Sequence, residues 1–476
     1  MDSDNHAKRL KKRLLIEISK LAFNDRLKED IDKLPVKLFP KNAQNIRCCI
    51  HKDRAVTKYR IQAILGFKAE DETDETTSLS EYVEIAKKRQ NITESNLTVL
   101  SDACSACLKG RHYITNVCKG CVARPCTVVC PKNAISMIDG HAVIDENLCI
   151  DCGKCLKVCP YHAIVNIPIP CEDSCPVNAI SKDENGLEVI DETTCINCGK
   201  CMLACPFGAI TEQSQIIDVI TKLKSKQKVA ALLAPAIAGQ FPYDFQKVIA
   251  ATRKLGFDKV YEVATGAKET AITEAKEFEH KMQEGSEFMT TSCCPAYMEF
   301  VEKHSPELKE YVSDTPTPMH FTGKMVKDIN NEDIVTVFIS PCPAKRVEAL
   351  KDNTIDYVLS AEEYGSLFVA AEIEIIDCDA EKADIDSEEN GRGFPVIGGV
   401  LSAVKNYVSN NIEIKPVVID GLDKNNCAIL KSFTKGKCPG NLVEVMSCAG
   451  GCVGGVNTIE TSVKATYKVS QYKDKQ

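Results

Sequence analysis

Five cysteines in the C-terminal half of the chain stand in three short motifs whose spacing suits a metal centre. SCAGGCVGG, at 447–455, holds two thiols four residues apart with glycines between and after them. A backbone without side chains can close tightly over a bulky inorganic group. Phosphate binding needs a Lys and a Ser or Thr at positions where this segment has neither. With TSCCPAY and SPCPAKRVE, the motifs supply Cys293, Cys294, Cys342, Cys448 and Cys452.

The adjacent cysteines Cys293 and Cys294 should have different roles. Consecutive side chains of an extended segment point to opposite sides, so one thiol can ligate a shared centre while the other faces the reaction space. We therefore expect a 4Fe-4S cube held by Cys294, Cys342, Cys448 and Cys452. The remaining thiol of Cys293, whose ordinary pKa is roughly 8.5, would be a proton donor.

Sixteen more cysteines lie between residues 104 and 205, and their spacing is regular. Two runs, at 149–160 and 195–206, follow C-x2-C-x2-C-x3-C-P, which gives three ligands to one 4Fe-4S cube and a fourth to its neighbour. A stretched version occupies 118–131, and 171–176 carries only the second half. These repeats resemble bacterial two-cluster ferredoxins, duplicated.

Because the last cysteine of each run ligates the neighbouring cluster, position assigns the ligands. Three clusters follow: Cys118, Cys121 and Cys126 with Cys159; Cys149, Cys152 and Cys155 with Cys130; Cys195, Cys198 and Cys201 with Cys175. Cys171 and Cys205 then lack two partners, and Cys104 and Cys107 are the spare pair nearby. Our hypothesis is a fourth cluster at these four thiols. A small zinc site or a thiol redox pair at Cys104 and Cys107 is the alternative.

Alternating strand and helix signals after residue 210 predict the elements that position the C-terminal motifs. Buried-strand runs occupy 229–233, 260–263, 334–339 and 417–419, and a long helical stretch covers 267–283. We expect an α/β domain at 214–462, an α+β ferredoxin-like domain with three to four clusters at 96–213, and a helical N-terminal region at 1–95. The charged tail at 463–476 should fray.

Bulk composition narrows the functional classes. A net charge of -8 over 476 residues gives no support to nucleic-acid binding. The N-terminus has no signal-peptide core, and no run reaches the roughly 18 apolar residues of a membrane span. The 26 cysteines are therefore expected in the reducing cytoplasm, as metal ligands rather than disulfides. No HExxH pattern occurs among the eight histidines, so zinc hydrolase chemistry has no support.

The three C-terminal motifs resemble the signature segments of the FeFe-hydrogenases. TSCCP, PCPAK followed by Glu348, and EVMSCAGGC occur in the order and spacing of that family. The resemblance covers most of residues 215–460, and Ala296, Tyr297 and Ser340 are closest to its second group (group B), typified by anaerobic clostridia. The ferredoxin region upstream is consistent with the same family.

This resemblance implies an H-cluster, in which a 4Fe-4S cube shares a thiolate with a two-iron unit bearing CO, cyanide and a dithiolate amine. Cys452 would be the bridging thiolate, and Cys294, Cys342 and Cys448 the other cube ligands. Lys345 would pair with a cyanide, Met446 would pack beside the two-iron unit and Cys293 would relay protons. The reaction would be 2H⁺ + 2e⁻ ⇌ H₂, with ferredoxin or a similar electron carrier and a set of maturation proteins as partners.

The outer proton route departs from the family pattern. Counting back from Cys293 by the family's offsets reaches Thr273 and Lys276 where glutamates are usual, although Ser313 stands where a serine is expected. Glu274, Glu277 or Glu279 are substitutes, but a glutamate on a helix face is more often simply solvated.

Two other functions remain open at this stage. One is an iron-sulfur assembly protein without the two-iron unit, and the other is a hydrogen sensor. The presence of Cys293, Lys345 and Met446 favours the enzyme.

Overall fold

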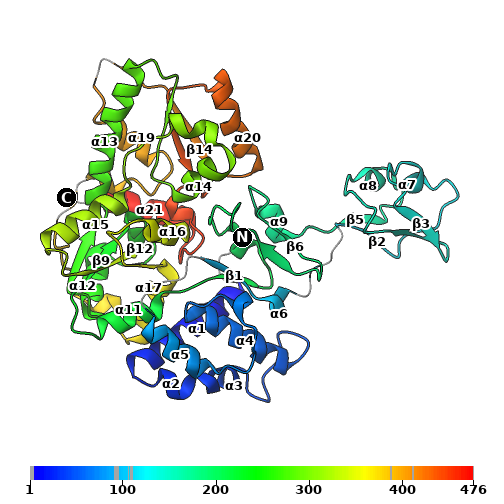
Figure 1. Cartoon of the computed structure of the whole chain (residues 1–476), viewed down its shortest axis with the longest axis horizontal. Coiled ribbons are helices and arrows are strands. Elements are labelled where there is room, and N and C mark those ends of the chain that lie inside the picture. Colours follow the sequence, from blue (N-terminus) through cyan, green and yellow to red (C-terminus); the bar gives the residue numbers. More distant parts are fainter. Residues whose placement is uncertain are drawn as a thin grey trace.

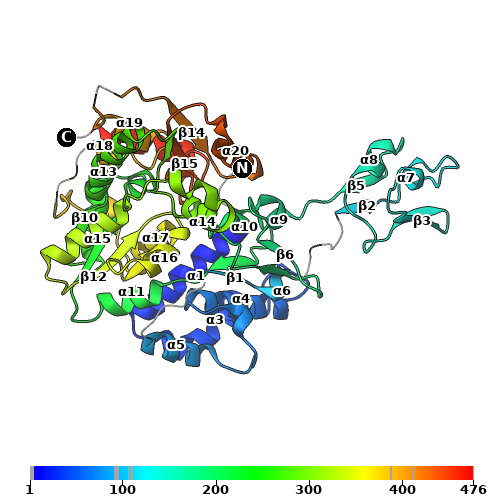
Figure 2. The same ribbon diagram turned by 45° about the horizontal axis from the view of Figure 1, so that its top comes forward.

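The computed structural model describes residues 5–89, 96–104, 107, 111–385, 387, 389–409 and 412–474. Figure 1 shows a large body, formed by the N-terminal helices and the C-terminal α/β region, and a small lobe that projects from it. Figure 2 shows the same separation after rotation. None of the helices in the described residues is long and apolar enough to cross a membrane.

The N-terminal region is helical, as its periodicity predicted. Its apolar residues at helical spacing, Leu14 and Ile18 among them, are fully buried. Ser78 caps the last helix by accepting a hydrogen bond from the N–H of Glu81. The helices are α1 (His6–Phe23), α2 (Leu27–Asp30), α3 (Leu34–Leu38), α4 (Ile50–Ile64) and α5 (Leu79–Lys88).

These helices share a hydrophobic core with the C-terminal half. Leu14, Leu15 and Ile18 of α1 belong to the same buried cluster as the strand that begins at Val229. Helix α1 packs along α17 (Ala361–Ala370) and α11 (Ile216–Leu223). The N-terminal region is therefore built into the body of the molecule.

The cysteine-rich region consists of one ferredoxin-like unit inserted into another. In the outer unit β1 (Leu97–Val99) pairs antiparallel with β8 (Ile210–Glu212), and β6 (Ile180–Lys182) pairs with β7 (Glu188–Ile190). In the inner unit β2 (His112–Ile114) pairs with β5 (Ile164–Asn166), and β3 (Ile135–Ile138) with β4 (His141–Ile144). The short helices are α6 (Ser101–Cys104), α7 (Pro125–Val128), α8 (Lys154–Val158), α9 (Pro170–Ser174) and α10 (Lys200–Ala204).

The inner unit is the projecting lobe of Figure 1, and residues 111–167 form it. It carries ten of the 23 exposed large apolar side chains that the described residues contain, although it is a small part of the chain. At its base the Arg111 guanidinium forms ion pairs with Glu172, at 2.7 Å, and with Asp173 of the outer unit. These ion pairs tie the lobe to the outer unit.

The C-terminal half is an α/β domain with two parallel sheets. The larger sheet has the order β10 (Lys259–Glu262), β9 (Val229–Leu233), β12 (Val335–Ile339), β13 (Tyr357–Leu359). The smaller has the order β11 (Met289–Thr290), β15 (Leu442–Met446), β14 (Pro416–Asp420). The expected strands at β9, β10, β12 and β14 are confirmed within two residues, and the helical stretch is α13 (Ala264–Gln283).

Other helices of this half flank the sheets or follow them in the chain. They are α12 (Phe245–Lys254), α14 (Pro295–His304), α15 (Pro318–Ile329), α16 (Ala344–Lys351), α18 (Glu389–Arg392), α19 (Gly399–Lys405), α20 (Lys424–Ser432) and α21 (Ser462–Lys473).

The expectation of a frayed tail is wrong for most of that segment. Helix α21 buries Ala465, Val469 and Tyr472 against the body, three residues at helical spacing within a charged sequence. The Tyr472 hydroxyl donates to Glu262 at the end of β10, and its ring contacts Phe245 with centroids 4.8 Å apart. Burial of one helix face therefore holds the segment in place.

Candidate active site

The five C-terminal thiols meet because their motifs follow the carboxyl ends of parallel strands. Cys293 and Cys294 come after β11, Cys342 after β12, and Cys448 and Cys452 after β15. All five line one cavity, with about 880 Å³ of space free of protein atoms. Crevices at the carboxyl ends of strands are the usual ligand sites of open α/β sheets.

The cavity is mostly apolar. Besides the cysteines it is lined by alanines, prolines, Phe338, Phe394, Met319 and Met446. Two glycines of the last motif let its loop fold against the neighbouring chain. Gly451 has φ +87°, and an added Cβ would lie 2.5 Å from the Pro395 carbonyl oxygen; at Gly454 it would lie 2.2 Å from that of Ala449. The glycine-rich loop is therefore packed tightly.

Four of these thiols fit a shared iron-sulfur cube. Burial, and next the neighbouring thiols, raise the pKa of Cys342 and of Cys452 to about 12. Without a metal such clustered, buried sulfurs stay protonated, whereas iron stabilises their thiolate form. The backbone N–H of Ser447 already points at the Cys294 sulfur, at 3.4 Å. The donor set is that of a cluster site.

Lys345 places the one ammonium group at the cavity wall among the described residues. Its Nζ lies 2.6 Å from Oε2 of Glu348 and 5.9 Å from the Phe338 ring centroid. Burial alone would lower the pKa of Lys345, but Glu348 and the thiols of Cys342 and Cys293 raise it above its usual value. The amine is therefore a fixed positive charge beside the sulfurs.

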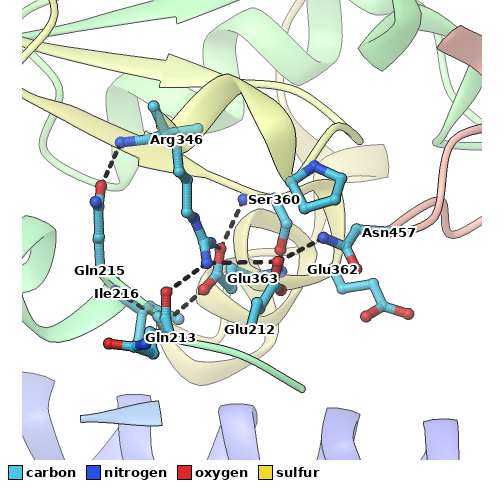
Figure 3. A network of polar contacts seen from close by, with 12 residues as sticks. Glu212, Gln213, Gln215, Ile216, Arg346, Ser360, Glu362, Glu363 and Asn457 are labelled. Carbon is cyan, nitrogen blue, oxygen red and sulfur yellow. Dashed lines mark hydrogen bonds and ion pairs between the residues drawn. The ribbon is translucent and has the colours of Figure 1, made fainter. Parts of the chain in front are cut away.

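The helix that carries Lys345 is anchored by its neighbour Arg346 (Figure 3). Arg346 donates to the Gln213 carbonyl at 2.6 Å and to Glu363 at 2.5 Å, and lies 3.4 Å from Glu212. Lys11 of α1 bridges Glu212 and Glu362, at 3.1 and 2.8 Å. One buried ionic network therefore joins α1, β8, α16 and α17.

Glu274 lies directly behind Cys293. Its side chain is fully buried, and its Oε1 accepts a 3.0 Å hydrogen bond from the Ser292 N–H, while Oε2 has no partner among the described residues. Burial raises the pKa of Glu274 to about 7; the Ser292 N–H opposes this shift and Glu277 adds to it. The pKa of Cys293 is raised well above its usual value by burial, and next by Glu274.

The expectation that a glutamate on this helix is simply exposed to solvent is therefore wrong for Glu274. Thr273 and Lys276, which the family offsets reached, do not face the cavity: Thr273 bonds back to Glu269 of its own helix, and Lys276 is exposed. The register of α13 turns the next residue, Glu274, inward. Glu274, and not Thr273, is therefore the residue of this turn that is buried beside Cys293.

Glu277, one turn further along α13, is the second glutamate of the group. It accepts from the Ser313 hydroxyl at 2.6 Å, from Thr315 Oγ1 at 2.8 Å and from the Asp314 N–H at 2.9 Å. Burial would raise its pKa, but these donors and Lys281 lower it below the usual value. Glu279 instead accepts from the Ser409 N–H, away from Cys293.

Sequence reasoning missed Glu444, a fully buried glutamate in β15. It accepts from the N–H groups of Gly398 and Leu401, at 2.7 and 2.9 Å, at the start of α19. Burial raises its pKa, and its charge influences both Cys293 and Cys452. The only signal in the sequence is a charged residue inside the apolar run LVEVM.

Fifteen of the sixteen upstream cysteines gather in four groups by their effects on one another's pKa, and Cys118 packs against the same apolar cluster as Cys126. In the outer unit, burial and mutual proximity raise the pKa of Cys104, Cys107 and Cys171, and each is influenced by Cys205. Cys195, Cys198 and Cys201 are all influenced by Cys175. In the inner unit Cys126 lies near Cys121 and Cys159, Cys149 lies near Cys130, and Cys155 near Cys149 and Cys152.

Each Cys-Pro step also presents a backbone donor to its sulfur. The N–H four residues on, always an alanine, lies 3.2–3.4 Å from the sulfur at Cys130, Cys159, Cys175 and Cys205. Among the described residues, His112, Cys149 and Asp151 are the one trio of donors that lie close enough together for a single metal ion, and Cys149 also belongs to an inner-unit group of thiols. The alternative of a zinc ion at Cys104 and Cys107 stays a prediction beside the fourth cluster, since Cys171 and Cys205 would complete the ligands of either.

The outer unit reaches the cavity through Cys198. This thiol lines the cavity and influences the pKa of Cys448. The adjoining Gly199, with φ +74°, packs so closely that an added Cβ would lie 2.8 Å from Pro343, next to Cys342. One cluster site therefore abuts the site in the α/β domain.

Comparison with known proteins identifies this combination. The C-terminal domain of the iron-only hydrogenase large subunit matches residues 227–456, an LdpA Fe-S cluster-binding domain matches 165–216, and a 4Fe-4S binding domain matches 141–164. Iron hydrogenase 1 of Clostridium pasteurianum is 28% identical over 400 residues, covering 71% of this chain and 69% of that protein. The periplasmic Fe hydrogenase large subunit of Nitratidesulfovibrio vulgaris is 29% identical over 373 residues, covering 66% and 85%.

More distant similarities are of two kinds. The human nuclear prelamin A recognition factor is 22% identical over 265 residues, covering 44% of this chain and 58% of that protein. A solved apo structure of the FeFe-hydrogenase HydA1 from Chlamydomonas reinhardtii aligns with a TM-score of 0.46 at 20% identity, over 54% of this chain and 88% of that one. The hydrogenase domain match, the iron-sulfur matches and the hydrogenase relatives show that residues 227–456 are an iron-only, or FeFe-, hydrogenase domain, which follows iron-sulfur cluster-binding domains.

Proposed function

We propose that this chain interconverts protons and H₂, 2H⁺ + 2e⁻ ⇌ H₂, in the cavity at the carboxyl ends of β11, β12 and β15. The observation that carries this proposal is the convergence of five thiols on one apolar cavity with Lys345 and Met446 in its wall. Cys294, Cys342, Cys448 and Cys452 would hold the cube of the H-cluster, and Cys452 would be shared with the two-iron unit. When bound, the H-cluster supplies the redox-active iron at which H₂ is made and split.

The protein contributes charge, shape and exclusion of water. Lys345 supplies a fixed ammonium that can donate hydrogen bonds to an anionic iron ligand such as cyanide. Met446 and Phe338 form part of the apolar wall. In this low-dielectric space a fixed charge acts more strongly than it would in water. Ser340 is buried beside Cys342, and its hydroxyl oxygen accepts a hydrogen bond from the Cys342 N–H at 3.3 Å, which adds one polar group to this wall.

Protons would pass along α13 to Cys293. The proposed order runs from Glu277, which is 19% exposed, through Ser313 and then Glu274 to the Cys293 thiol. The hydrogen bond from Ser313 to Glu277 and the unpartnered Oε2 of Glu274 support this order. A carboxyl group whose pKa is about 7 is close to the optimum for accepting and returning a proton at neutral pH.

Electrons would enter through the projecting lobe. The proposed order is the two inner-unit clusters, the cluster of Cys104, Cys107, Cys171 and Cys205, then the cluster of Cys195, Cys198, Cys201 and Cys175. Because Cys198 lines the cavity, its cluster is placed last, next to the proposed H-cluster site. We propose a ferredoxin-type one-electron carrier as the partner and the reducing cytoplasm as the location, which the high cysteine content favours.

The test is spectroscopic and catalytic. The chain produced together with hydrogenase maturation proteins should show infrared bands of CO and cyanide and should evolve H₂ from a reduced dye. Cys293→Ala should keep the bands and lose about 10²–10⁴-fold in turnover, because a positioned proton donor contributes that much. Cys378→Ala is the control, since this buried thiol donates to Glu374 of its own turn, outside the cavity lining.

A chain with cubane iron alone and no gas turnover would contradict the proposal. That result would favour the assembly-protein alternative, in which the two-iron unit is absent.

A further inference from the structure

Arg60 of α4 is a buried cation without a carboxylate partner. Its side chain is 7% exposed, and its Nη2 donates to the backbone carbonyls of Phe207 and Gly208, at 3.2 and 2.8 Å. Its Nε has no hydrogen-bond partner, and no carboxylate of the described residues forms an ion pair with it. Burial and the nearby Arg47 lower its pKa to about 10, and Cys205 is the charged neighbour that opposes this.

Among the described residues, the other buried arginine, Arg346, and the mostly covered Arg89 are paired with carboxylates. Arg346 lies between Glu212 and Glu363, and its pKa is raised in spite of burial (Figure 3). Arg89 forms an ion pair with Asp218. An unpaired buried charge costs several kcal/mol, so a counter-charge is expected at Arg60 as well.

The backbone that Arg60 holds belongs to a cluster loop. Phe207 and Gly208 follow Cys205 directly, and Arg47 also donates to the Phe207 carbonyl, at 3.4 Å. The N–H of Ala209 closes the same turn by donating to the Cys205 sulfur at 3.4 Å. Arg60 therefore lies against the turn that carries one thiol of the outer-unit group.

A cube bound by four thiolates supplies the missing negative charge. Each thiolate contributes one negative charge, and uptake of an electron adds another to the cube. A fixed cation nearby stabilises the reduced form more than the oxidised form, and burial strengthens the effect. Cluster potentials respond to the surrounding charge in this way.

We propose that Arg60 is the counter-charge of the cluster held by Cys104, Cys107, Cys171 and Cys205, and that it raises the reduction potential of that cluster. The inference rests on the proposed cluster assignment. The cluster takes one electron from the inner-unit clusters and passes one electron to the Cys198 cluster. Through Arg60, helix α4 of the N-terminal region thereby sets the reduction potential of a cluster in the middle of the electron path.

The test is a redox titration of the intact, iron-loaded protein followed by electron paramagnetic resonance. Cys171→Ala identifies the signal, because loss of this cluster should remove about four iron atoms and one signal. In Arg60→Gln the midpoint potential of that signal should become more negative by about 59 mV. This shift corresponds to a tenfold change in the equilibrium constant for one-electron reduction of the cluster. Arg60→Lys keeps the charge and should stay near the wild-type midpoint.

Arg54→Gln is the matched control on the same helix, since Arg54 donates to the Phe39 carbonyl and does not contact the Cys205 turn. An unchanged midpoint in Arg60→Gln, with iron content intact, overturns the inference. If Arg60→Gln loses the cluster, Arg60→Lys decides: retention supports a charge effect, and equal loss overturns it. Failure of Cys171→Ala to lose iron would instead contradict the cluster assignment itself.

Discussion

Glu274 is the residue whose environment most affects its chemistry. Burial raises its pKa from 4.5 to about 7, so it is protonated below that pH and ionised above it. Glu274→Gln should lower turnover about 10²–10⁴-fold and remove an inflection near pH 7 from the pH–rate profile. Stopped-flow or gas-evolution assays across pH 5–9 would measure this, and Lys276→Gln on the exposed face of α13 is the control.

The same substitution should also change the pH dependence of stability. The unfolded chain ionises Glu274 near 4.5, while the folded chain resists ionisation up to about 7, so the wild type loses stability as pH rises through this window. Glu274→Gln should therefore be more stable than the wild type at pH 8 and nearly equal to it at pH 5. Equal thermal shifts at both values would mean that the carboxyl is not desolvated.

The proposed cluster ligands could be assigned from the sequence, whereas for the proposed proton route the sequence could name Glu274, Glu277 and Glu279 as candidates but could not choose among them. Cys342 and Cys448 stand in motifs whose spacing is itself the signal. The role of Glu274 depends on the register of α13 and on the complete loss of water around one carboxylate, which arise only when the helix packs. Glu444 was missed for the same reason.

At the scale of the elements, we expect the stability of the fold to depend strongly on the buried ion pairs that hold α16. Arg346→Met removes the cation between Glu212 and Glu363, leaving two buried carboxylates without it. The loss should cost about 3–5 kcal/mol of unfolding free energy, the usual effect of breaking a buried pair. The free energy of unfolding from urea titration, together with the midpoint temperature of thermal unfolding, would test this expectation.

Lys351→Met on the same helix is the matched control. Lys351 is 61% exposed and pairs with Glu299, so its removal should cost at most about 1 kcal/mol. Equal losses from the two variants would mean that the Arg346 network is no stronger than a surface pair.

The alternation of strands and helices could be predicted from the sequence, but the strands β11 and β15 and the C-terminal helix α21 could not. Runs such as that of β9 are apolar throughout, because both faces of a parallel sheet are covered. Strand β11 has only two residues and β15 contains a glutamate, so neither gives a clear pattern. Helix α21 buries one narrow face in a charged segment, and only its contacts reveal it.

For the whole molecule, the central feature is the insertion of one ferredoxin-like unit into another. The inner unit enters between Cys107 and Cys171, which separates two thiols of a single ligand run. The pairing of β1 with β8 and of β2 with β5 explains why Cys104 and Cys107 meet Cys171. Spacing along the sequence could only suggest this meeting, because strand pairing brings the two halves together.

Removal of residues 108–168 is therefore expected to leave a working protein. The junction restores the regular run, Cys104-x2-Cys107-Ile169-Pro170-Cys171, and keeps the buried Ile169 in place. The shortened protein should lose about eight iron atoms, four for each cube. It should retain H₂ evolution with a small reduced dye as the electron donor and lose most of its rate with a protein electron carrier, because the projecting lobe carries the proposed entry clusters.

Iron analysis and the two assays side by side would measure this, with Tyr113→Ser on the intact lobe as a control for surface changes. Equal rates from the carrier before and after excision would place electron entry on the body of the molecule.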